Sequence, residues 1–294
     1  MSDDGQHGLT VIAMLGNVFS PYYAWRRRRA APNLDPFDHC ALNVVLYGRD
    51  GKKRWAMTER GRGALHQSAD TLRIGPSGLH WDGEALTIDV DELTVPLPSR
   101  LRGRIRVHPS AINPQDFVLD GKARHRWWPI APVARVELDF QNPGLRWSGA
   151  GYLDSNRGEE PLEAGFQRWD WSRAALSDGA ATLYDATERD GRNSQLALRF
   201  ARNGEVEQVA PPPRAALPTA SVWRVGRGTQ CEAGDQARVV QTLEDTPFYV
   251  RSVVETRLCG ERVESVHESL DLDRFAANWV QMLLPFRMPR KTWD

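Results

Sequence analysis

The chain has 294 residues, 41% of them hydrophobic, and its 38 basic residues balance 38 acidic ones. A chain of this length and composition buries a core large enough for one large or two moderate domains, which excludes an intrinsically disordered protein. The balanced charge also argues against nucleic acid as a partner, because no global positive field is available to attract phosphate.

Several site classes are missing from the residue pattern. Cys40, Cys231 and Cys259 form no C-x-x-C pair, which predicts reduced thiols. No H-x-H or H-E-x-x-H spacing, phosphate loop or G-x-S-x-G elbow is present, so we predict neither a metal site nor a cofactor. No apolar run approaches the roughly 20 residues of a membrane span, so we expect a cytoplasmic protein that is soluble or peripherally attached to a membrane.

The first unusual segment, FSPYYAWRRRR, comprises residues 19–29. Its aromatic and basic residues are Phe19, Tyr22, Tyr23 and Trp25, followed by Arg26, Arg27, Arg28 and Arg29. Aromatic rings at headgroup depth beside guanidinium groups form an interfacial anchor, which makes this segment a candidate for peripheral membrane contact. The alternative is an ordinary charged loop after buried aromatic residues.

Glycine after aspartate or asparagine recurs along the chain between short apolar segments. The pairs are Asp50-Gly51, Asp82-Gly83, Asp120-Gly121, Asp178-Gly179, Asp190-Gly191 and Asn203-Gly204. Apolar residues alternate with polar ones in these segments, as at Leu86, Ile88 and Val90. Such pairs favour two-residue hairpin turns of type I′, which need positive φ at both central positions. The pattern therefore predicts antiparallel β-structure.

Two stretches place chemically active side chains on one face of a strand. In GYLDSNRG, Tyr152 and Asp154 are two positions apart, and in HRWWPIAP, His125 and Trp127 have the same offset. In an extended segment residues i and i+2 point the same way, so each pair shares a face. These four residues are the candidate site.

Gly149 and Gly151 fall on the opposite parity to Asp154. Glycine within a strand often marks a close approach of backbone or ligand, so we expect another element to pack closely behind the acid. The alternative is purely structural: Trp127 is a core aromatic residue, His125 a satisfied imidazole, and Asp154 a turn residue.

A second catalytic interpretation uses two carboxylates. Asp170 or the pair Glu159 and Glu160 would join Asp154 in a glycosidase site, and the eleven tryptophans would suit sugar stacking. Acidic residues in loops are usually only solvated. The glycosidase interpretation is therefore weaker than the site formed by Tyr152, Asp154, His125 and Trp127.

The C-terminal third contains a proline-rich break and a helical pattern. The run APPPRAALP, residues 210–218, cannot pair in a central strand and marks the expected domain boundary. The helical pattern comprises Phe275, Trp279, Met282, Leu283 and Phe286, at spacings typical of one amphipathic helix. We therefore predict a mainly β protein with two domains of barrel or sandwich type, 1–209 and 210–294, and a C-terminal helix.

The chain resembles the carotenoid 1,2-hydratases of phototrophic purple bacteria, also called hydroxyneurosporene synthases. The motifs that carry the resemblance are NVFSPYYAWRRRR, DHCALNVVLYG, RWAMTERG, IGPSGLHWDG, HRWWPIAP, GYLDSNRGEEPLE and RWDWSR. They extend from about Gly16 to beyond Arg173, and the likeness continues more thinly after that. The resemblance implies two lipocalin-like antiparallel β domains that hold a hydrophobic ligand.

The resemblance also implies an activity, which is cofactor-free addition of water to the terminal C1–C2 double bond of acyclic carotenes such as neurosporene or lycopene. The acid of the family's G-Y-x-D motif corresponds to Asp154 and its tyrosine to Tyr152. The H-x-W motif corresponds to His125 and Trp127. We expect Asp154 to protonate the alkene, Trp127 and Tyr152 to face the resulting cation, and His125 to handle the water. The alternative is a lipocalin-like carrier that binds an isoprenoid without catalysis.

Overall fold

The computed structural model describes residues 1–29, 34–48 and 51–291. The chain folds into two compact units, each of which is assembled from separate segments of the sequence. Unit 1 consists of Met1–Pro109, Arg135–Gly151 and Gln281–Asp294, and unit 2 consists of Ser110–Ala134 and Tyr152–Val280.

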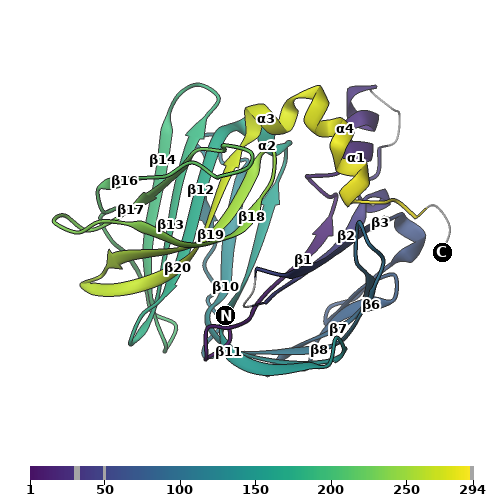
Figure 1. Ribbon diagram of the computed structural model, residues 1–294, viewed down its shortest axis with the longest axis horizontal. Helices are drawn as coiled ribbons and strands as arrows, with labels where there is room; N and C mark the ends of the chain where they lie inside the picture. Colours follow the sequence, from purple (N-terminus) through teal and green to yellow (C-terminus); the bar gives the residue numbers. More distant parts are fainter. Residues whose placement is uncertain (30–33, 49–50, 292–294) are drawn as a thin grey trace. The chain divides into compact units, whose positions relative to one another are not determined.

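Two antiparallel sheets contain the first eleven strands (Figure 1). One has the order β1-β2-β3, and the other has the order β11-β10-β8-β7-β6-β5-β4 with β9 paired to β10. The strands are β1 (Gly8–Leu15), β2 (Cys40–Tyr47), β3 (Lys53–Arg60), β4 (Leu65–Gln67), β5 (Thr71–Ile74), β6 (Ser77–Trp81), β7 (Leu86–Leu93), β8 (Arg100–Pro109), β9 (Phe117–Val118), β10 (His125–Asn142) and β11 (Leu145–Gly158). The short helices of this part are α1 (Pro21–Arg28), η1 (Pro36–Asp38) and η2 (Arg62–Ala64).

Unit 2 is built on a seven-stranded antiparallel sheet with the order β15-β14-β13-β12-β20-β19-β18. A two-stranded sheet, β16-β17, accompanies it. The strands are β12 (Phe166–Ala175), β13 (Gly179–Glu188), β14 (Asn193–Ala201), β15 (Val206–Gln208), β16 (Arg214–Leu217), β17 (Arg227–Gln230), β18 (Arg238–Asp245), β19 (Tyr249–Leu258) and β20 (Glu261–Asp271). The helices that follow in chain order are α2 (Leu162–Gly165), α3 (Leu272–Ala276) and α4 (Asn278–Arg287), the last of which continues into unit 1.

The prediction of a mainly β, lipocalin-like protein with a helical C-terminal segment is confirmed. The C-terminal segment forms two helices, α3 and α4, because Ala277 between them adopts an extended conformation. The proline-rich run contributes only β16, which lies between its prolines and pairs with β17 outside the large sheet.

The compact units differ from the predicted division into 1–209 and 210–294. Residue 210 lies inside unit 2, where β15 before it and β18 after it belong to the same sheet. The boundary was predicted from the change in composition at the proline-rich run. Such a change does not reveal which strands before and after it pair with each other.

The Asp-Gly and Asn-Gly pairs mark connections between paired strands, as predicted. Gly83 connects β6 to β7, Gly191 connects β13 to β14, and Gly204 connects β14 to β15, all with positive φ. The expected type I′ geometry is wrong at these three turns, because the preceding Asp or Asn does not have positive φ. The loops are longer than two residues, so one left-handed glycine is enough to reverse the chain. Asp50 of the first pair lies outside the described residues.

The close packing expected behind β11 is confirmed. A Cβ atom added to Gly149 would overlap the Met1 carbonyl oxygen, and one added to Gly151 would overlap the Val136 side chain. In contrast, a Cβ atom at Gly144, in the β10–β11 turn, would meet nothing within 4 Å.

We predict that Gly149→Ala lowers the free energy of unfolding by about 1–3 kcal/mol, because the N-terminal backbone must move to admit the methyl group. Chemical denaturation followed by tryptophan fluorescence measures the change. Gly144→Ala is the matched control and should stay within about 0.5 kcal/mol of the parent. Equal stability of both variants would contradict the close approach at Gly149.

Candidate active site

A row of four side chains crosses the seven-stranded sheet of unit 2. Arg251 of β19 lies opposite Glu268 of β20, Glu268 lies opposite Trp171 of β12, and Trp171 lies opposite Tyr184 of β13. Directly opposed residues of an antiparallel sheet point to the same face. We call these four residues the cross-strand row. Figure 1 shows the strands that carry it, β13, β12, β20 and β19, side by side.

Two of the predicted site residues pack on this row. The ring centroid of Tyr152 lies 5.3 Å from that of Trp171, and the ring of Trp127 lies 4.9 Å from that of Tyr184 in an edge-on contact. Trp127 is only 1% exposed. β10 and β11 therefore place their functional residues against the same face of the sheet.

Asp154 is joined to this cluster by a hydrogen bond. The indole Nε1–H of Trp127 donates to Oδ2 of Asp154 at 2.8 Å. The pKa of the Asp154 carboxyl is raised to about 6, chiefly because burial disfavours the carboxylate; the Trp127 hydrogen bond opposes this shift, and the negative charge of Glu268 contributes to it. About a tenth of Asp154 is therefore protonated at pH 7, far more than of an ordinary surface aspartate.

The aromatic wall beside the acid remains neutral. Burial raises the pKa of Tyr152 and of Tyr184 well above the usual value, and the charge of Asp154 adds to both shifts. Both phenols therefore keep their protons. The site offers π faces and O–H donors beside the carboxyl, without a phenolate that would trap a cation.

Arg173 adds a buried cation that the sequence did not suggest. Its guanidinium carbon lies 5.7 Å from the ring centroid of Tyr152, and its Nη2 donates to the Pro132 carbonyl oxygen at 2.9 Å. Burial lowers the Arg173 pKa to about 10, so the group stays charged at neutral pH. One side of the Tyr152 ring is therefore already close to a positive charge.

His125 is buried, and its ring lies near the carboxylate of Glu160. Its ring contacts Phe166 at 4.8 Å between centroids, and its Nε2 lies 3.8 Å from Oε1 of Glu160. The backbone of His125 is fixed by a 2.7 Å hydrogen bond from its N–H to Asp120. Burial lowers the pKa of the imidazole, which favours the neutral form that accepts a proton. Its role with water stays a prediction.

The structure does not bring Asp170 together with Asp154. Asp170 precedes Trp171 on β12, so its side chain points to the opposite face of the sheet, where it accepts hydrogen bonds from Ser269 and from the Gly228 N–H. Burial raises the Asp170 pKa to about 6 as well. The expected two-carboxylate glycosidase site with Asp170 is therefore wrong, because a sheet separates the two acids.

Glu268, Trp171 and Tyr184 are the members of the site that sequence reasoning missed. They lie on three strands, and only the strand register brings them together. The motif RWDWSR contains Trp171, and His267-Glu268 is an unusual pair on a strand, but neither pattern indicates which face or which partner is involved.

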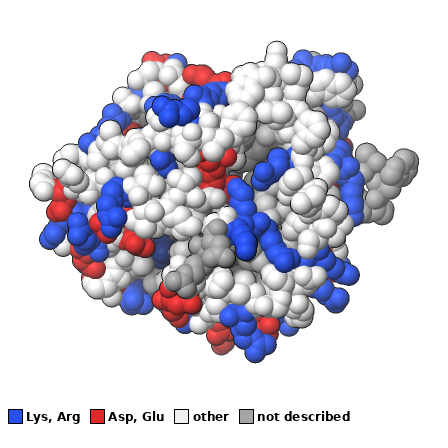
Figure 2. Space-filling view, in the orientation of Figure 1, with Lys and Arg blue, Asp and Glu red and all other residues white. Residues whose placement is uncertain are grey.

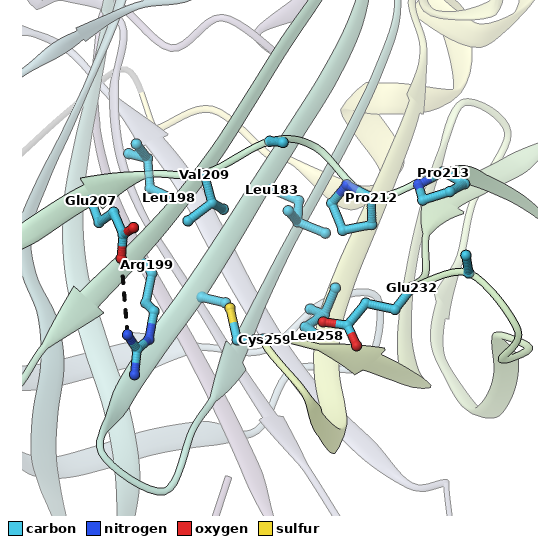
Figure 3. Close-up of a pocket in the computed structure, with 13 residues that line it drawn as sticks. Leu183, Leu198, Arg199, Glu207, Val209, Pro212, Pro213, Glu232, Leu258 and Cys259 are labelled. Atoms are coloured by element: carbon cyan, nitrogen blue, oxygen red, sulfur yellow. Dashed lines mark ion pairs between the residues drawn. The ribbon is translucent and has the colours of Figure 1, made fainter.

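Two cavities of unit 2 differ in their relation to this site. The larger, about 460 Å³, is lined by apolar side chains such as Leu183, Val209 and Leu258, with the Arg199–Glu207 ion pair at its edge (Figure 3). Leu183 precedes Tyr184 on β13, so this cavity lies on the face opposite the cross-strand row.

The smaller cavity, about 290 Å³, borders the site. Its lining includes Phe117, Trp169 and Tyr184. Phe117 and Tyr184 both contact Trp127, at 6.0 and 4.9 Å between ring centroids. Asp154 lines neither of these two cavities.

Most of the aromatic and basic segment of residues 19–29 forms α1, Pro21–Arg28, in unit 1. Three of its aromatic rings contact the protein: Phe19 packs on a cluster around Met14, the Tyr22 hydroxyl donates to the Met288 carbonyl oxygen at 3.3 Å, and Tyr23 stacks on His39 at 4.6 Å. Trp25 is 55% exposed, with the Arg29 guanidinium 3.9 Å from its ring centroid. Membrane contact by this segment stays a prediction, and Trp25 is the ring best exposed to make it.

Charged side chains are spread over the visible face of the molecule, where basic and acidic ones are interspersed with uncharged ones (Figure 2). Within the described parts of the chain, no cluster of three or more His, Cys, Asp or Glu residues is placed to hold a metal ion. No helix in those parts is both long and apolar enough to cross a membrane.

Comparison with known proteins identifies the family. Residues 11–294 match the family model described as carotenoid hydratase CrtC. The chain belongs to the CrtC carotenoid hydratase family. Its relatives include the acyclic carotenoid 1,2-hydratase of Thiocapsa roseopersicina, which is 67% identical over 99% of this chain and 71% of the relative.

Further relatives and one solved structure extend the comparison. The acyclic carotenoid 1,2-hydratases of Rubrivivax gelatinosus and Cereibacter sphaeroides are 51% and 43% identical, over 99% and 96% of this chain and 71% and 98% of their own lengths. The crystal structure of CghA with Sch210972 has a TM-score of 0.55 at 12% identity and covers 92% of this chain and 86% of that one. At this identity the likeness between CghA and this CrtC family member concerns the fold alone.

Proposed function

We propose that the chain adds water to the terminal C1–C2 double bond of acyclic carotenes such as neurosporene or lycopene, by acid catalysis and without a cofactor. Membership of the CrtC family supports hydration of acyclic carotenoids as the reaction class. The observation that carries the proposal is the Asp154 carboxyl, with its pKa raised to about 6, held by Trp127 among aromatic rings.

The proposed reaction begins with proton transfer from Asp154 to C2 of the alkene. An alkene is a very weak base, so the donor must be protonated before the substrate arrives and must be held in contact with it. Burial of Asp154 provides the first condition, because desolvation disfavours the carboxylate. The hydrogen bond from Trp127 supports the second condition, contact with the alkene, because it fixes the direction of the carboxyl group.

The second step is capture of the tertiary cation at C1 by water. Tyr152 and the rings around Trp127 offer π faces, and a desolvated cation over such a face is stabilised by about 2 kcal/mol or more. This corresponds to about a thirtyfold increase in rate, so the rings assist the acid and do not replace it. The hydrogen bond from Trp127 to Asp154 supports a second role for Trp127, as the donor that orients the acid.

Incubation of the purified chain with lycopene in ¹⁸O-labelled water tests the proposal. The expected product has the mass of the substrate plus one labelled water, formed equally well after chelation and gel filtration. Binding of lycopene without any mass change would favour the carrier interpretation instead. A strict requirement for an added metal or cofactor would contradict the proposed mechanism.

We predict that Trp127→Phe reduces the hydration rate by about tenfold and moves its pH profile to higher pH. The variant keeps an aromatic ring, but it loses the N–H that lowers the pKa of Asp154 and directs its carboxyl. Steady-state rates measured between pH 5 and pH 9 check both effects. Trp128→Phe is the matched control, because Trp128 donates to the Asn113 carbonyl oxygen and not to Asp154. An unshifted profile for Trp127→Phe would contradict the positioning role.

A further inference from the structure

Glu268 lies within the site but has no place in the reaction described so far. It stands opposite Trp171 in the cross-strand row, and the Trp171 ring contacts Tyr152, two residues before Asp154. Residues directly opposed in an antiparallel pair have Cβ atoms about 4.5–5.5 Å apart. The Glu268 carboxylate is therefore on the same face of the sheet as the acid.

The two carboxyl groups have different environments. Arg251, 5% exposed, donates to Oε1 of Glu268 through Nε at 3.0 Å and through Nη2. Glu268 thus carries its negative charge in an ion pair, whereas no cation pairs with the Asp154 carboxyl among the described residues. Neighbouring carboxyl groups with different electrostatic partners commonly divide the roles of acid and base.

Arg251 leaves one oxygen of Glu268 available. Both of its hydrogen bonds to Glu268 go to Oε1, and Oε2 accepts no hydrogen bond from the described part of the chain. This oxygen can accept a proton without breaking the ion pair. The sequence pointed to His125 for handling the water, but the His125 ring contacts Phe166 and Glu160 instead of this row.

Trp171, which lies directly opposite Glu268 in the sheet, carries a hydrogen-bond donor that is unused within the described part of the chain. Trp171 is 4% exposed, and its buried Nε1–H has no hydrogen-bond acceptor among the described residues. A buried donor without an acceptor costs about 1–3 kcal/mol, so such a group needs an explanation. A water molecule that accepts a hydrogen bond from Trp171 and donates one to Glu268 would give both groups a partner. Its remaining lone pair would be available to attack the cation at C1.

We propose that Glu268 is the base that accepts a proton from the attacking water and that the Trp171 N–H donates a hydrogen bond to the oxygen of this water; this inference rests on the proposed function. The O–H bond of Asp154 breaks and a C–H bond forms at C2 from the π electrons. The water oxygen then forms the C1–O bond, and one water proton passes to Glu268. Transfer of that proton from Glu268 through solvent to Asp154 restores both groups, so the sum is the addition of one water.

Glu268→Gln tests this assignment, because it keeps the size of the side chain and a hydrogen bond to Arg251. We expect the hydration rate on the low-pH plateau to fall by about 10²-fold. In D₂O we expect the recovered carotene to gain deuterium, because the cation still forms but returns to the alkene by losing a proton. The matched control is Glu264→Gln, an exposed acid on the same strand, which should hydrate at the parent rate.

Three results would overturn the inference. Hydration by Glu268→Gln at the parent rate would exclude a base role. A pH profile moved to lower pH with its maximum unchanged would mean that Glu268 only adjusts Asp154. Loss of deuterium exchange together with hydration would place Glu268 in the protonation step. A parent protein that hydrates no acyclic carotene would instead contradict the proposed function itself.

Trp171→Phe provides an independent test that leaves the Glu268–Arg251 ion pair intact. It removes the N–H and keeps a ring beside Tyr152. We expect a loss of about tenfold in hydration, with an unmoved pH profile and retained deuterium exchange. Hydration at the parent rate would contradict the role of Trp171 in holding the water.

Discussion

Asp154→Asn is expected to abolish hydration, with a loss of at least about 10³-fold, because the amide cannot donate a proton to carbon. The Trp127 N–H still has an oxygen acceptor in this variant, so the packing of the site is kept. Product formation from lycopene, measured by chromatography and mass spectrometry, gives the result. Hydration at the parent rate would contradict the assignment of the acid.

Asp170→Asn is the matched control. Desolvation also raises the pKa of Asp170 to about 6, but Asp170 lies on the other face of the same sheet, where Ser269 and Gly228 donate to it. We expect this variant to keep its hydration activity. An equal loss in both variants would mean that any buried acid in unit 2 is needed for the structure, and the role of Asp154 would lose its support.

The stability of Asp154→Asn separates a chemical loss from unfolding. In the parent the folded Asp154 keeps its proton up to about pH 6, whereas the unfolded residue loses it near 3.8. The folded state therefore binds more protons between these values, and the free energy of unfolding falls as pH rises through them, by up to about 3 kcal/mol. Asparagine removes this dependence, so the variant should be more stable than the parent at pH 8.

The second large effect is the pH dependence of hydration. The active form has a protonated Asp154, so kcat/KM should be constant at low pH and fall as pH rises through about 6. Well above that pKa the fall should be about tenfold per pH unit, which gives about a hundredfold loss at pH 8 relative to the plateau.

Initial rates at limiting lycopene, in buffers from pH 4.5 to pH 9, measure this profile. Circular dichroism at each pH confirms that the protein stays folded. The inflection should move to higher pH in Trp127→Phe and to lower pH in Glu268→Gln, because the first loses a hydrogen bond to the carboxylate and the second loses a neighbouring negative charge. A rate that rises with pH through this range would contradict a protonated acid as the catalyst.

Local features of this protein follow directly from the order of its amino acids. Alternation of apolar residues and glycine turns specified antiparallel strands, because these signals depend on neighbours within a few residues. The offset of two between Tyr152 and Asp154 placed them on one face of β11, and their motifs indicated the family before any comparison. Gly149 and Gly151 indicated the close packing behind that strand.

The surroundings of the acid, in contrast, depend on strand pairing over long distances in the chain. The cross-strand row joins four strands, and its register depends on pairings between residues up to about 100 positions apart, which leave no periodic signal in the sequence. For the same reason the sequence offered Asp170 as a partner of Asp154, although strand pairing places it on the opposite face and brings Glu268 to the site. Burial, which raises the pKa of Asp154, is likewise a property of the packed sheet and not of the motif.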